Sequence, residues 1–255
     1  MSVMSTPMKL TRAHKRGHNV DGFGIEILFP GLTVDISDSG IGAIGRIDQA
    51  RIRPGTVIPM HPHKDDEILT YMRSGELTHR DTVGHVEQVT PRRLMLMNAG
   101  HTFQHEEQAR PDGEPLTALQ IFMRPRAPDL EPMVQFHEFE TIYSHNTWRL
   151  VAGPEGAPLL LRADAWIEDV RLDAGQSLAL PTRRALQAAR LLYVFDGQVE
   201  VAGISLQTGE SLLLDDETSP TITATGQSDL VLFTTDMSAQ TYKGGMFSGN
   251  VMNKL

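Results

Sequence analysis

Residues 68–97 read ILTYMRSGELTHRDTVGHVEQVTPRRLMLM: a strand-like run, a glycine, a second run, a turn and an apolar run. A related pattern returns at residues 190–214, RLLYVFDGQVEVAGISLQTGESLLL. When the two stretches are superposed, Tyr71 and Gly75 coincide with Tyr193 and Gly197. A hairpin pattern that repeats after roughly 120 residues indicates two copies of one domain.

The rest of the chain consists of similar short runs. GIEILF, TALQIFM, QVEVAG and DLVLFTT are examples, and Gly, Pro, Asp and Ser separate them, while helical periodicity is scarce. This pattern predicts an all-β sandwich or barrel. Three prolines in RPRAPDLEP (124–132) indicate a connection between the halves. We therefore expect two domains, residues 1–130 and 131–255.

Composition excludes several classes of protein. The 255 residues carry 23 basic and 32 acidic side chains, a net charge of −9, which gives no general attraction for nucleic acid or anionic lipid. Cysteine is absent, which excludes disulfides, thiolate catalysis, zinc–thiolate sites and iron–sulfur clusters. No apolar run is long enough for a signal peptide or a membrane span, so a cytoplasmic protein with no membrane partner is expected.

Two histidine clusters stand out, PMHPHKDDE (59–67) and AGHTFQHEE (99–107). Alternate residues of a strand share a face, so His61, His63 and Glu67 point one way, and His105 points with Glu107. Imidazoles and a carboxylate without sulfur suit iron, manganese, nickel, copper or catalytic zinc. A lone pair of such histidines is more often surface or core, but two clusters favour a metal site. The alternation of side chains along a strand does not decide whether Glu67 or Glu107 is the carboxylate ligand.

These residues also carry a resemblance. HPHKDDEILTYMRSGELTHRDTVGH and TPRRLMLMNAGHTFQHEE resemble the signature of the pirin family within the cupin superfamily: HPH, a Glu four residues later, a strand-ending Gly, an HRD-type hairpin, and AG followed by HxE. The likeness is close over residues 54–107. It implies a bicupin, two tandem jelly-roll-type β-barrels, with one divalent metal in the N-terminal barrel. Fe(II) is the expected ion, and Mn, Ni, Cu and Zn are the alternatives.

Carried over position by position, the resemblance implies the metal ligands His61, His63, His105 and Glu107. Cupins in general use the carboxylate at Glu67 instead, and here Glu67 is expected to accept hydrogen bonds or a substrate proton. Glu67 and Glu107 are thus the candidate catalytic residues. His101 shares the face of the second cluster and is expected to line the pocket.

The repeat predicts a contrast between the halves. Sliding the first half along the chain puts Arg183, Ala185 and Ala189 at the positions of His61, His63 and Glu67. In the second cluster, Ile222 and Ala224 replace His105 and Glu107. We therefore expect the second cupin to lack a metal.

The resemblance implies two functions. Some pirins are similar in activity to quercetin 2,3-dioxygenases, which cleave a flavonol with O₂, so a small aromatic flavonol, enol or phenol is the expected substrate. The alternative is a non-enzymatic, redox-sensitive regulator that binds a protein partner through its metal domain. One departure affects the substrate: Lys64, Asp65 and Asp66 stand where many pirins have Arg-Gly-Phe, which makes the site more acidic.

His79 and His85, in the hairpin, are expected to be structural or exposed.

Overall fold

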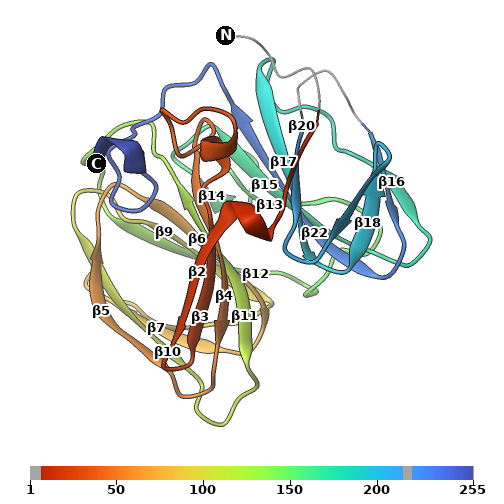
Figure 1. Ribbon diagram of the computed structural model, residues 1–255. Coiled ribbons are helices and arrows are strands. Elements are labelled where there is room, and N and C mark those ends of the chain that lie inside the picture. Colours follow the sequence, from red (N-terminus) through yellow and green to blue (C-terminus); the bar gives the residue numbers. More distant parts are fainter. Residues whose placement is uncertain (1–6, 215–219, 255) are drawn as a thin grey trace.

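The computed structural model describes residues 7–214 and 220–254, and Figure 1 shows two halves built almost entirely from strands. Each half has a large sheet and a small sheet that face one another, with apolar side chains between them. The two sheets of a half are not joined into one closed barrel, and the arrangement is that of a jelly-roll cupin. The predicted all-β bicupin fold is confirmed. The described helices are three short 3₁₀ turns, η1 (Arg12–His14), η2 (Pro30–Thr33) and η3 (Val251–Lys254).

The first half contains eleven of the described strands. Its large sheet has the order β12 (Met133–Glu138), β9 (Arg93–Asn98), β6 (Glu67–Ser74), β11 (Leu116–Met123), β4 (Ile44–Ile52), β3 (Phe23–Leu28) and β2 (Lys15–Val20). Its small sheet has the order β5 (Val57–His63), β10 (Phe103–Ala109), β7 (Leu77–Asp81) and β8 (Val86–Val89). All of these pairs are antiparallel.

The second half repeats this plan. Its large sheet has the order β1 (Met8–Leu10), β20 (Ser211–Leu214), β17 (Ala188–Asp196), β22 (Ser228–Asp236), β15 (Ala165–Leu172), β13 (Arg149–Gly153) and β14 (Leu159–Leu160). Its small sheet has the order β16 (Ser177–Ala179), β21 (Thr221–Ala224), β18 (Gln198–Val201) and β19 (Ile204–Gln207). The small sheets therefore match strand for strand, which supports the duplication inferred from the sequence.

The two tyrosines that revealed the repeat lie at the interface between the halves. In the first half Tyr71 lies two strands from Gln49 across the sheet, and in the second half Tyr193 lies in the same relation to Asp169. Each hydroxyl donates to the other half: Tyr71 Oη to Asp169 Oδ2 at 2.8 Å and Tyr193 Oη to Gln49 Oε1 at 2.7 Å. All four side chains are buried. The large sheets thus pack against each other through a nearly two-fold pair of hydrogen bonds.

The halves also exchange their ends. Strand β1, near the N-terminus, pairs with β20 of the second half, and β12, which follows the proline-rich connection, pairs with β9 of the first half. The division predicted at residue 130 therefore precedes a strand that belongs to the first sheet. The last described turn, η3, also lies beside the first half in Figure 1.

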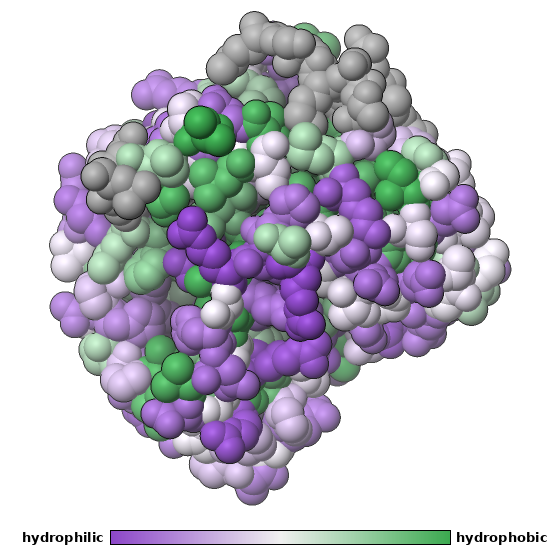
Figure 2. Space-filling model, viewed as in Figure 1, coloured by the Kyte–Doolittle hydropathy of each residue, from purple (hydrophilic) through white to green (hydrophobic). Residues whose placement is uncertain are grey.

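Strand β2 ends the first large sheet with the polar sequence KRGHNV, and most of it is exposed. Figure 2 shows a hydrophilic band over this part of the molecule, as expected of an edge strand that must resist pairing with another chain. Among the described residues no helix is long and apolar enough to cross a membrane.

Candidate metal centre

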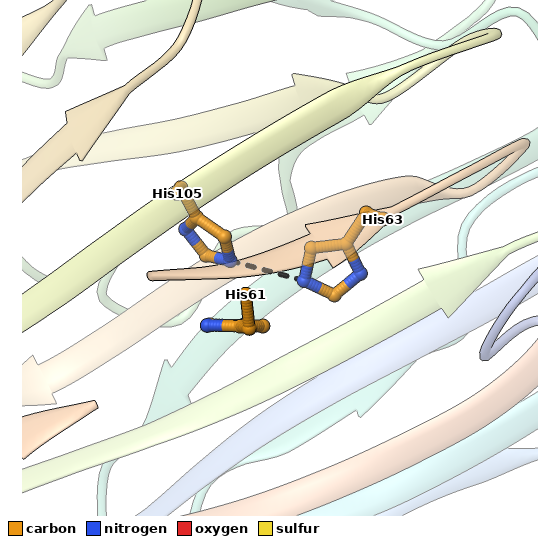
Figure 3. A group of neighbouring side chains, drawn as sticks. All are labelled: His61, His63 and His105. Carbon is orange, nitrogen blue, oxygen red and sulfur yellow. Dashed lines mark hydrogen bonds between the residues drawn. The ribbon is translucent and has the colours of Figure 1, made fainter. Parts of the chain in front are cut away.

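Three histidines meet on the inner face of the small sheet of the first half. Strands β5 and β10 pair with His105 opposite His61 and Phe103 opposite His63, so alternation puts the three imidazoles on one side. Their ring centroids lie 4.3 to 5.0 Å apart. The Nε2 atoms of His63 and His105 are 3.0 Å apart, and Figure 3 shows the three rings converging. The structure therefore brings together the three histidines that the sequence placed in one site.

Hydrogen bonds fix the proton of His61. Its Nδ1 lies 2.8 Å from the carbonyl oxygen of Pro59, which can only accept, so Nδ1 carries the hydrogen and Nε2 keeps its lone pair. Burial lowers the pKa of His61, and the neighbouring His63 adds to this effect. The imidazole is therefore neutral near pH 7, the form that binds a metal.

A longer chain of hydrogen bonds fixes His105. Asp81 Oδ2 accepts from His79 Nε2 at 2.8 Å, which leaves His79 Nδ1 as the acceptor for His105 Nδ1–H at 3.3 Å. The lone pair of His105 Nε2 is then directed at the cluster. Burial lowers the pKa of both histidines, and the charges of neighbouring histidines lower that of His105 further. We call Asp81, His79 and His105 the histidine relay.

The sequence reasoning underrated His79. It was expected to be structural or exposed, but it is fully buried and contacts a predicted ligand. The signal was its alternation with Asp81 in the HRD hairpin: β7 pairs with β10 so that His79 lies opposite Glu107. Only the strand order, which the sequence does not reveal, brings β7 beside β10.

Glu107 lies beside the three histidines but not in the same group. Its carboxylate forms a second candidate group with His79 and His105, and one oxygen is 3.9 Å from His105 Nδ1. The Gln120 amide donates to both oxygens at 3.4 Å, and no described Lys or Arg pairs with them. Burial raises the pKa of Glu107 to about 7. A buried carboxylate without a cationic partner is costly, and a divalent ion would supply the missing charge.

Glu67 faces a different environment. Arg162 of the second half donates from Nε to Oε1 at 2.9 Å and from its backbone N–H to Oε2 at 3.0 Å, and the Asn98 amide donates as well. Burial raises the pKa of Glu67, and the Arg162 charge opposes that effect. The carboxylate is thus occupied by an ion pair between the halves, and the contacts support a structural role. Its predicted catalytic role receives no support from this geometry.

His101 is also placed away from the cluster. Its imidazole lies at the surface, 3.4 Å from Glu131, rather than lining the metal group. The chain turns at Gly100, where φ is +56°, before β10 begins at Phe103, so strand parity does not extend back to residue 101.

An aromatic and cationic wall adjoins the histidines. The Phe247 ring is 5.0 Å from the His63 ring and 5.5 Å from Phe122. The Arg46 guanidinium lies 5.2 Å from the Phe122 ring and 5.5 Å from that of Phe247, and pairs with Asp48. Sequence reasoning missed this wall because Phe247 comes from the far end of the chain.

In the second half, apolar residues stand at the corresponding positions. Two residues after Gly75, Leu77 pairs with Ala109, and two residues after Gly197, Val199 pairs with Ala224. Ile222, which lies opposite Val201 as Glu107 lies opposite His79, is therefore the counterpart of Glu107, and the predicted alignment of Ala224 with Glu107 was wrong by two residues. Ile222 also pairs with Leu178 as Glu107 pairs with Ile58, so Leu178 is the counterpart of Ile58. The predicted alignment of Arg183 and Ala185 with His61 and His63 is not reproduced, because β16 ends at Ala179, the counterpart of Pro59, and both residues lie beyond it.

The residues of the first half fit a divalent ion. Two ligands at right angles, each about 2.1 Å from a metal, lie about 3.0 Å apart. The His63 and His105 Nε2 atoms have this separation. Three imidazole nitrogens and one carboxylate form a donor set without sulfur, which suits iron, nickel, manganese, copper or catalytic zinc.

Comparisons with known proteins agree with this picture. The pirin family profile matches residues 34–123, and that of the quercetinase C-terminal cupin domain matches residues 150–235. A pirin-like protein of Caulobacter vibrioides is 30% identical over 78% of this chain and 85% of its own length. The quercetin 2,3-dioxygenase of Escherichia coli is 27% identical over 88% of this chain and 96% of its own.

Solved structures give the same result. The bacterial pirin YhhW from Escherichia coli, in complex with nickel(II), superposes with a TM-score of 0.78 at 24% identity, covering 91% of this chain and 99% of that one. This likeness shows the fold, and the sequence relatives identify the family. The chain belongs to the pirin family of the cupin superfamily.

Proposed function

We propose that the protein is a metal-dependent dioxygenase of the quercetin 2,3-dioxygenase type, acting on a flavonol or a related enol or phenol. His61, His63, His105 and Glu107 would hold one divalent ion, for which we propose Fe(II). The observation that carries the proposal is the convergence of three imidazoles next to a buried carboxylate that pairs with no described Lys or Arg. The relatives named as quercetin dioxygenases and the nickel complex of YhhW support both the metal and the substrate class.

The bound ion would act as a Lewis acid that polarises the substrate hydroxyl and provides open positions for the reactants. The chain's own residues would do the rest. Glu107, a buried carboxylate beside His105, would accept the hydroxyl proton on an Oε atom. The Arg46 guanidinium would balance the charge of the resulting phenolate, and the Phe122 ring would lie against a flat substrate.

The histidine relay would keep the site in its active form. Because Asp81 and His79 fix the tautomer of His105, its Nε2 stays unprotonated while a proton moves elsewhere in the site. Phe103 and the buried inner face of the sheets would exclude water from the reacting atoms.

The test is turnover. Metal-loaded protein is mixed with quercetin, and O₂ uptake and carbon monoxide release are measured, with His105→Ala and the free metal as controls. The proposal predicts equal consumption of O₂ and substrate by the wild type and loss in the variant. A protein that holds stoichiometric metal but consumes no O₂ with flavonols, enols or catechols contradicts the enzyme and favours a redox-sensitive regulator.

A further inference from the structure

The last part of the chain crosses back to the metal-bearing half. Residues 242–250, which we call the C-terminal arm, follow the last strand of the second half and lie along the first. The arm is held by Tyr242 N–H to Pro125 O at 2.8 Å, Met246 N–H to Lys64 O at 2.9 Å, and Arg124 Nε–H to Ser248 O at 3.0 Å. Gly45 of β4 permits this approach, since a Cβ there would lie 2.2 Å from Ser248 O.

Asp66 is the main anchor of the arm. This buried carboxylate accepts the backbone N–H of Phe247 at 3.1 Å and that of Ser248 at 2.8 Å. Gly245 makes the close contact possible: a Cβ there would lie 2.5 Å from Asp65 O and 2.8 Å from Asp66 Oδ1. Distances this short cannot be relieved by a flexible side chain, because one of the atoms belongs to the backbone.

His63 lies on the other side of the same carboxylate. Its Nε2 faces His105, whereas its Nδ1 is buried and makes no hydrogen bond with a described residue. Asp66 Oδ2 is 3.7 Å from this Nδ1, and the Phe247 ring of the arm packs against the imidazole. Of the three clustered histidines, His61 and His105 have Nδ1 anchored at 2.8 and 3.3 Å, so His63 is the one whose second nitrogen waits for an acceptor.

We propose that the C-terminal arm is part of the metal centre, with Asp66 as a positioning residue that orients His63. Metal-bound histidines usually donate their other N–H to a carboxylate or carbonyl, and loss of that acceptor weakens metal binding about 10- to 100-fold. The docked arm holds Asp66 Oδ2 3.7 Å from His63 Nδ1, so a small approach lets the carboxylate accept the Nδ1–H, and Phe247 restrains the ring. This inference rests on the proposed function in one respect, the ligation of the metal by His63.

Linkage gives the proposal a second consequence. If docking of the arm strengthens metal binding by some factor, metal binding must strengthen docking of the arm by the same factor. Lys243, at the start of the arm, offers a readout: its side chain is half-exposed and pairs with Asp38 at 2.7 Å. Proteases cut extended backbone, and in the docked arm the Lys243 carbonyl accepts from the Asn250 N–H at 2.8 Å. The rate of trypsin cleavage after Lys243 therefore reports undocking of the arm without reference to catalysis.

The experiment compares Gly245→Ala and Asp66→Asn with the control Gly226→Ala, where a Cβ would meet no atom within 4 Å. Ni(II) affinity is measured by competition with a chelator, and cleavage after Lys243 is followed by mass spectrometry with and without Ni(II). We expect about 10- to 100-fold weaker binding in both test variants. We expect wild-type affinity in the control, and protection of Lys243 by Ni(II) in the wild type but not in His63→Ala.

The outcomes separate the inference from the proposed function. A wild type that binds no stoichiometric Ni(II) contradicts metal ligation itself. A wild type that binds Ni(II), with unchanged affinity in Gly245→Ala and Asp66→Asn and no protection of Lys243, overturns the role of the arm and leaves the metal site intact.

Discussion

Substitution of Asp169 should lower the free energy of unfolding more than any other single change at the contact between the halves. Asp169 is fully buried and accepts hydrogen bonds from Tyr71 at 2.8 Å, Arg73 at 2.8 Å and Arg149 at 2.7 and 2.9 Å. Tyr71→Phe removes one donor and leaves two guanidinium partners, so we expect a loss of about 1.5 kcal/mol in the free energy of unfolding. Asp169→Asn leaves the buried Arg73 and the half-buried Arg149 beside a neutral amide, and we expect a loss of about 3–5 kcal/mol.

The assay is urea unfolding followed by tryptophan fluorescence, with thermal midpoints beside it. At this chain length 1 kcal/mol corresponds to about 2–4 °C in Tm, so Tyr71→Phe should lower Tm by about 3–6 °C. Tyr242→Phe is the control, because its hydroxyl makes no hydrogen bond with a described residue. The reasoning is refuted if Asp169→Asn costs no more than Tyr71→Phe, or if Tyr71→Phe is indistinguishable from the control.

Three further predictions concern single sites. His79→Phe breaks the relay and should weaken metal binding about 10- to 100-fold, measured by chelator competition; unchanged affinity would contradict the tautomer assignment. Arg162→Ala leaves the Glu67 carboxylate buried without its cation and should cost about 3–5 kcal/mol in urea unfolding while metal stoichiometry stays at the wild-type value; loss of metal would instead place Glu67 in the site. Burial raises the pKa of Asp48 from 3.8 to about 6, with Arg46 opposing the effect, so the protonated form is favoured by folding. Its contribution to stability therefore decreases as pH rises from about 4 to about 6, and Asp48→Asn should gain up to about 3 kcal/mol relative to the metal-free wild type between pH 4 and pH 7. A constant difference between the two proteins across that range would show that Asp48 is ionised throughout.

The repeat was visible in the sequence because both tyrosines and both glycines are required by the same geometry. Tyr71 and Tyr193 each reach across the interface, and Gly75 and Gly197 each adopt a positive φ, +76° and +99°, at the end of a strand. Such requirements leave a pattern at fixed spacing. The four-residue separation in each half follows directly from the common strand and turn.

The candidate ligands could be predicted for a similar reason. Period-two alternation along β5 and β10 decides which side chains share a face, and the antiparallel register then places His105 opposite His61. Glu67 shows the limit of this reasoning. Parity put Glu67 on the face of His61 and His63, but Asp65, with a φ of +54°, interrupts the strand between them. Within β6, Glu67 shares the face of Tyr71 that contacts the other half, and Arg162 reaches it there.

Contacts between distant parts of the chain could not be predicted. Neither the return of the C-terminal arm to Asp66 nor the pairing of β1 with the second half has a local signal, because each depends on how the complete halves pack. The register of the second small sheet was also misread: Ile222 rather than Ala224 takes the place of Glu107, and β16 ends before the position expected for Arg183.

The central claim is that His61, His63, His105 and Glu107 bind one metal ion in the first half, and metal content tests it most directly. The protein is purified without oxygen, and metal per chain is measured by mass spectrometry for the wild type and His63→Ala. The account predicts about one equivalent of metal, with iron expected, in the wild type and its loss in the variant. A wild type without stoichiometric metal, or a variant that retains it, would contradict the assigned ligands and the dioxygenase proposal that depends on them.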